Sequence, residues 1–106
     1  MLDVTPLQNA VDAFADRLRS LPQSTLGRGA AAEALALARE LADRAQRIET
    51  PQREPYALPD AGMFAVGDQL AVAGHDLAEA LRNTSAAPAG ELAEAVRKVR
   101  ETAGRW

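Results

Sequence analysis

Residues 27–49 read GRGAAAEALALARELADRAQRIE, and this stretch decides the fold. Its leucines and alanines recur at steps of three and four residues, which places them along one side of an α-helix. A second apolar stripe, formed by Leu35, Ala38 and Ala42, lies beside the first and indicates contact with two neighbours. The helix should end before Pro51, because the residue preceding a proline disfavours helical geometry. We therefore predict one long helix over 27–49.

Three further segments repeat this helical spacing on either side, and they predict helices over about 6–20, 60–82 and 88–103. Thr5 is the expected N-cap of the first helix, because Pro6 suits the first helical position. Asp60 is the expected N-cap of the third. Abundant alanine, the residue with the best helix propensity, agrees with this interpretation.

Residues 50–60 interrupt the helical pattern with prolines at 51, 55 and 59, so we expect an extended connection between helices two and three. Tyr56 and Leu58 are its expected anchors on the helices. No segment alternates in the manner of a β-strand. The sequence therefore predicts one domain, 1–106, an all-α antiparallel four-helix bundle.

Composition narrows the classes of function. The chain has no cysteine, one histidine and a net charge of −3. These values exclude disulfides and cysteine-bound zinc, and they argue against a general phosphate-binding surface. The sequence shows neither a signal peptide nor an apolar run long enough to cross a bilayer. We expect a cytoplasmic protein without catalytic residues or a cofactor, hence not an enzyme.

Two interior glycines, Gly67 and Gly74, stand out in the third predicted helix. Each costs about 1 kcal/mol relative to alanine in a helix interior. In a sequence so rich in alanine, they indicate that something approaches the helix closely. Tight packing between helices of the same fold is one interpretation, and a subunit interface or ligand groove is the other.

The leading functional hypothesis is a non-enzymatic bundle that acts through protein–protein contact, as a homo-oligomer or as the partner of another protein. Apolar and small residues outside the main core require cover, and small residues let backbones approach. The predicted interface combines the second stripe of helix two with the small-residue flank of helix three: Leu35, Ala38, Ala42, Phe64, Gly67, Ala71, Gly74 and Ala78.

Two alternatives come from other classes. One is a bundle that binds a small molecule or a metal around His75, with Asp68 and Glu79 as the remaining candidate ligands. Bundles with two metal ions use a Glu-x-x-His motif on each of two helices, which a chain with one histidine lacks. The other is a DNA-associated regulator, because basic residues gather late in the last predicted helix: Arg97, Lys98, Arg100 and Arg105.

One resemblance concerns residues 59–77, PDAGMFAVGDQLAVAGHDL. This stretch resembles segments of small uncharacterised helical proteins of GC-rich actinobacteria. It covers about a fifth of the chain, as the residue numbers show. The resemblance implies a bacterial setting and names no activity, cofactor or site residue.

Overall fold

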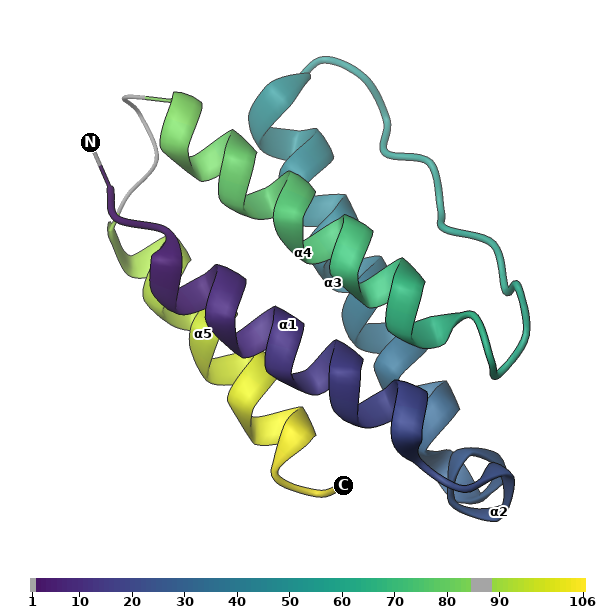
Figure 1. Cartoon of the computed structure of the whole chain (residues 1–106). Helices are drawn as coiled ribbons and strands as arrows, with labels where there is room; N and C mark the ends of the chain where they lie inside the picture. Colours follow the sequence, from purple (N-terminus) through teal and green to yellow (C-terminus); the bar gives the residue numbers. More distant parts are fainter. Residues whose placement is uncertain (1, 85–88) are drawn as a thin grey trace.

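The computed structural model describes residues 2–84 and 89–106, and four long helices pack against one another in it (Figure 1). The described part of the chain contains no strand, so the prediction of an all-α four-helix fold is confirmed. The elements are α1 (Thr5–Ser20), α2 (Gln23–Thr25), η1 (Leu26–Ala30), α3 (Ala31–Glu49), α4 (Val66–Asn83) and α5 (Ala89–Ala103).

Helix α1 begins one residue earlier than predicted and has a different cap. Thr5 is already helical, and its backbone N–H donates to Oδ1 of Asp3 at 3.0 Å. The prediction of Thr5 as the N-cap is therefore wrong. The carboxylate two residues upstream satisfies one of the free N–H groups that every helix start leaves open.

The second predicted helix is divided near its start. Gly29, within η1, has a φ of 136°, which an L-residue rarely adopts, and this kink separates the turns that precede it from α3. Regular α-helix consequently begins at Ala31 rather than at residue 27, whereas its end at Glu49 is as predicted.

The third helix starts six residues later than predicted, at Val66. Asp60 caps a turn rather than a helix, because its Oδ1 accepts the backbone N–H of Gly62 at 2.8 Å. The φ of Gly62 is 96°, a conformation that glycine favours. Residues 60–65 thus belong to the connection, and we call residues 50–65 the strap.

The strap determines the direction of α4. It runs from the end of α3 back along the bundle, so that α3 and α4 lie side by side and parallel (Figure 1). The predicted antiparallel packing holds for α1 against α4 and for α3 against α5, whereas α1 and α5 run parallel. Helix α5 starts at Ala89; the predicted start at residue 88 lies outside the described residues.

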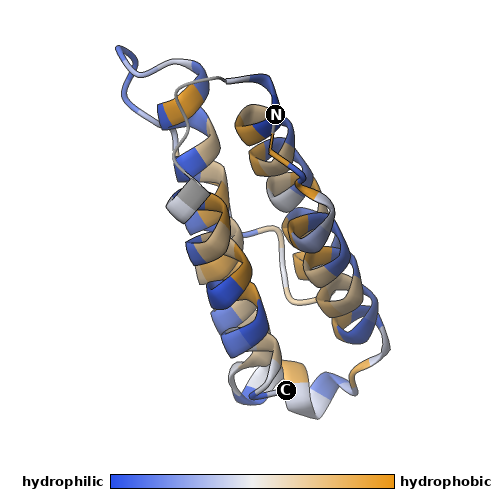
Figure 2. Cartoon of the chain, turned by 90° about the vertical axis from the view of Figure 1, so that its left-hand side faces the viewer, coloured by the Kyte–Doolittle hydropathy of each residue, from blue (hydrophilic) through white to orange (hydrophobic). Residues whose placement is uncertain are grey.

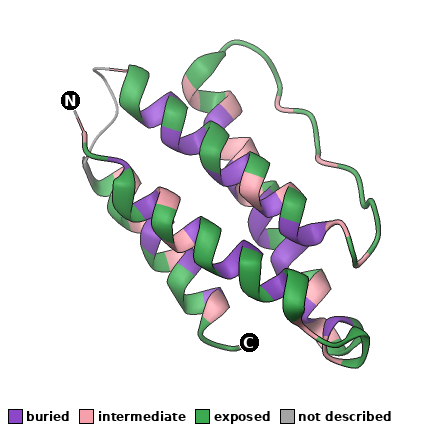
Figure 3. Cartoon of the chain, in the orientation of Figure 1, coloured by how far each residue is buried: buried purple, intermediate pink, exposed green. Residues whose placement is uncertain are grey.

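The core lies between the four helices. Apolar and polar segments alternate along each helix, and the buried segments turn inward while the strap stays at the surface (Figures 2 and 3). Each large apolar side chain that is fully buried contributes about 1.5–3 kcal/mol to folding. The largest are Phe14, Leu7, Leu41, Leu70, Leu77, Leu81, Val11 and Val99. None of the described helices is long and apolar enough to span a bilayer.

The C-terminal tail packs back on the bundle. Glu33 of α3 accepts hydrogen bonds from Nε of Arg105 at 2.8 Å and from Nε1 of Trp106 at 3.3 Å. Arg17 of α1 donates to the backbone carbonyl of Trp106. The only tryptophan in the chain therefore bridges α1, α3 and the end of α5.

Candidate functional site

Most of the predicted interface is inside the molecule. Gly74 packs on α1, where a Cβ added at this position would lie 2.5 Å from both methyl groups of Val11. Gly67 likewise faces the backbone carbonyl of Ala15. The glycines therefore serve close packing within the fold. This burial removes five of the eight predicted residues from any surface contact: Leu35, Ala38, Gly67, Gly74 and Ala78.

The other three predicted interface residues reach the surface, each from a different element. Ala42 and Ala71 are half-buried, on α3 and α4 respectively. Phe64 is 72% exposed and lies in the strap, just before α4. Only these three residues of the predicted interface therefore remain accessible on the surface.

The residues around His75 bind separate partners. Nε2 of His75 lies 2.7 Å from Oδ1 of Asp12 on α1. Asp68 accepts from the guanidinium of Arg19 at 2.8 Å. Glu79 pairs with Arg82, which lowers the pKa of Glu79 because the cation favours the charged carboxylate. No group of three or more potential metal ligands occurs among the described residues, so His75, Asp68 and Glu79 do not form one site.

The basic residues in α5 and just after it are largely paired with glutamates. Arg97 contacts Glu94 at 2.9 Å and Glu101 at 2.7 Å. The hydrogen bond from Arg97 lowers the pKa of Glu94. Lys98 contacts Glu40 at 3.3 Å. Arg105 likewise contacts Glu33. Arg97, Lys98 and Arg105 are therefore partly neutralised within the chain, which argues against phosphate binding by these residues.

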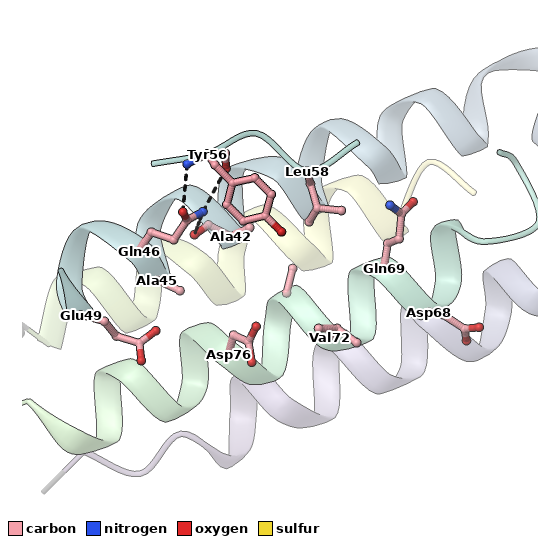
Figure 4. Close-up of a pocket in the computed structure, with 11 residues that line it drawn as sticks. Ala42, Ala45, Gln46, Glu49, Tyr56, Leu58, Asp68, Gln69, Val72 and Asp76 are labelled. Carbon is pink, nitrogen blue, oxygen red and sulfur yellow. Dashed lines mark hydrogen bonds between the residues drawn. The ribbon is translucent and has the colours of Figure 1, made fainter. Parts of the chain in front are cut away.

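The structure instead presents a groove between α3, α4 and the strap (Figure 4). Its volume is about 350 Å³, in the range of sites that hold a small ligand or one large side chain. Alanines, carboxylates and amides all contribute to its lining. The lining residues are Ala42, Ala45, Gln46, Glu49, Tyr56, Leu58, Asp68, Gln69, Val72, Ala73 and Asp76.

Two large apolar side chains of this groove face solvent. Tyr56 is 73% exposed and Val72 is 62% exposed. Phe64 is the third large apolar residue exposed to this extent in the described chain, and it does not line the groove. Exposed aromatic and branched side chains that flank an apolar groove are typical of a binding surface.

An amide clamp fixes the backbone of Tyr56. Gln46 donates from Nε2 to the Tyr56 carbonyl at 3.1 Å, and its Oε1 accepts the Tyr56 N–H at 3.0 Å (Figure 4). Two further contacts hold the strap: Arg39 donates to the Leu58 carbonyl at 2.7 Å, and Gln69 donates to the Pro59 carbonyl at 2.8 Å. The Tyr56 side chain is therefore exposed to solvent although the backbone of this residue is fixed by hydrogen bonds.

The sequence prediction found part of this site. It named Tyr56 and Leu58 as anchors of the connection, and Leu58 does pack against the core, whereas Tyr56 faces solvent. It missed Val72 and Gln46, since neither belongs to a main apolar stripe. The available signal was the valine itself, an apolar residue on the polar side of its helix.

The comparisons with known proteins identify no relative. No protein-family model, no curated protein and no solved structure matches this chain at a significant level. The resemblance of residues 59–77 to small actinobacterial proteins consequently stays a prediction, and no residue role is transferred to this chain.

Proposed function

We propose that this protein is a non-enzymatic binding module that acts through protein–protein contact, and that its contact surface is the groove between α3, α4 and the strap. The observation that carries this proposal is Tyr56, an aromatic side chain that is largely exposed although its backbone is clamped by Gln46 at two points. The clamp holds the ring-bearing residue in one backbone conformation, so the exposed ring is available as a preformed contact.

Preorganisation supports this role. Tyrosine is enriched among the residues that dominate binding energy at interfaces, because its ring offers a large contact area with little loss of conformational freedom. Holding the strap in place before binding lowers the ordering cost that the complex would otherwise bear. Tyr56 and Val72 would form the exposed sides of the contact, while Ala42, Ala45 and Ala73 would receive an apolar side chain of the partner.

The test is selection of a random peptide library on the immobilised protein, followed by affinity measurements on the enriched peptides. Replacing Tyr56 by serine should weaken binding by more than about tenfold, in the range that a central interface aromatic contributes. The matched control is Phe64→Ser, which removes an equally exposed aromatic residue outside the groove. Circular dichroism should show that both variants fold.

Peptides that bind wild type and Phe64→Ser equally but lose affinity for Tyr56→Ser would support the groove. Loss of affinity in Phe64→Ser alone would place the contact elsewhere. Sedimentation velocity of the same variants tests whether the partner is a second copy of the chain. In that case, Tyr56→Ser should reduce self-association and Phe64→Ser should not.

A further inference from the structure

We infer that the groove recognises a basic partner segment, in which a lysine or arginine lies next to the apolar side chain that enters the groove. This inference rests on the proposed function and specifies the chemistry of the partner. It is carried by two carboxylates, Glu49 and Asp76, which line the groove from α3 and α4 respectively (Figure 4).

These two carboxylates differ from the other acidic residues of the chain. The sequence contains fifteen Asp and Glu residues, and all of them lie in the described part. Twelve contact a basic side chain or a backbone N–H group, and Glu54 interacts electrostatically with Arg47. The twelve are Asp3, Asp12, Asp16, Glu33, Glu40, Asp43, Asp60, Asp68, Glu79, Glu91, Glu94 and Glu101.

Within the described chain, Glu49 and Asp76 are the acidic residues without such a partner, and both line the same groove. Because the other acidic residues have partners within the chain, the location of these two carboxylates in one groove indicates that they pair with a cation of the binding partner. Among the residues that the structure describes, no lysine, arginine or histidine lines the groove. The arginines of α3 that flank it are occupied, since Arg39 donates to the Leu58 carbonyl and Arg47 to Asp43.

The position of Glu49 strengthens the inference. It is the last residue of α3, where the partial negative charge of the helix dipole disfavours a carboxylate. A cation bound between Glu49 and Asp76 would offset this repulsion and satisfy both groups. The groove wall from Ala42 to Glu49 is about 10 Å long at the rise of an α-helix. A partner segment of about two helical turns can therefore place an apolar residue on the lining alanines and a basic one at the carboxylates.

The test uses three synthetic peptides that share one leucine stripe and differ only in the flanking residues, which are lysine, glutamine or glutamate. Affinities come from calorimetry, and NMR shifts of Ala42, Val72 and Ala73 locate the binding. The lysine peptide should bind about three- to tenfold more tightly than the glutamine peptide, as expected for two solvent-exposed ion pairs. The glutamate peptide should bind most weakly.

The decisive variant is Glu49→Gln combined with Asp76→Asn, which should make the lysine and glutamine peptides bind equally. Because the whole chain carries a charge of −3, the matched control removes two carboxylates elsewhere, by Asp16→Asn with Glu54→Gln. It should keep most of the lysine preference.

Two results would overturn the inference. If the glutamine or glutamate peptide binds as tightly as the lysine peptide, or if both double variants reduce the preference equally, the groove does not select a cation, although it still binds apolar segments. If no peptide shifts the groove resonances, the inference fails together with the proposed function. Loss of the preference in the Glu49/Asp76 variant alone supports the inference.

Discussion

Gly74 of α4 lies directly against Val11 of α1, so closely that a Cβ at position 74 would come within 2.5 Å of both valine methyl groups. This contact sets the spacing of the antiparallel pair α1 and α4. It also decides between the two interpretations of the interior glycines, because the helix that approaches α4 belongs to the same chain.

Gly74→Ala should destabilise the protein by about 1–3 kcal/mol, the usual cost of overpacking a core, despite the better helix propensity of alanine. Urea denaturation measures this loss. Val11→Ala in the same chain should recover part of it, since the smaller side chain makes room for the new methyl group. Gly90→Ala is the control: in the described part of the chain, no atom beyond its chain neighbours and its own helix backbone lies within 4 Å of the added Cβ. The change should therefore be neutral or stabilising by up to about 1 kcal/mol.

Gly29→Ala should cost about 1–3 kcal/mol, because alanine is strained at the φ of 136° that Gly29 adopts. The new methyl group would also come within 3.3 Å of the Trp106 ring. Tryptophan emission should therefore shift together with the unfolding midpoint. Gly27→Ala provides the comparison, since the nearest atom to its Cβ is the flexible end of Met63 at 3.9 Å. An equal effect in both variants would contradict the special role of Gly29.

Acid should release the C-terminal tail. Hydrogen bonds from Arg105 and Trp106 lower the pKa of Glu33 below its ordinary value of 4.5. The stabilisation that this contact provides is therefore complete above the unfolded-state pKa and is lost as the pH falls through the lowered folded-state value. Trp106 fluorescence should change as the pH falls below the ordinary pKa of 4.5, while far-UV circular dichroism stays constant.

Glu33→Gln should abolish this acid transition of the tail, since an amide does not titrate. Glu94→Gln removes another carboxylate with a lowered pKa, remote from the tail, and should leave the transition in place. A transition that persists in Glu33→Gln would assign the fluorescence change to a different group.

The Gln46 clamp should protect the Tyr56 amide from hydrogen exchange. Gln46→Met keeps the length of the side chain but removes both hydrogen bonds to Tyr56, and it should cost about 1 kcal/mol. The Tyr56 amide should then exchange severalfold faster in NMR measurements. Gln52→Met changes an exposed strap residue without touching the clamp and should leave this rate unchanged. Equal exchange rates in wild type and Gln46→Met would contradict the clamp.

Local rules predicted the helices well, because spacing of three and four residues depends only on neighbours in sequence. Residues 31–49 illustrate this: apolar periodicity and the proline at 51 define a helix that ends at Glu49. The errors arose where one residue competes with the pattern. Gly29 breaks the second helix through its backbone conformation, and Asp60 caps a turn around Gly62 although its residue type equally suits a helix start.

The groove and the direction of α4 depend on contacts between distant residues, which periodicity does not report. Gln46 meets Tyr56 only because the strap turns back along α3, and His75 meets Asp12, 63 residues away in sequence, rather than Glu79 one turn ahead. The prolines of residues 50–60 predicted an extended connection, but they did not predict the path that this connection takes along the bundle. The parallel alignment of α3 and α4 follows from that course.

The course of the strap also determines how the molecule divides. A single cut within it would yield two fragments, one with α1 and α3 and the other with α4 and α5. Helix α4 packs on both helices of the first fragment, and its buried leucines belong to the common core. Neither fragment can cover its apolar stripe alone, so the nicked chain should remain a noncovalent heterodimer that reassembles when its halves are mixed.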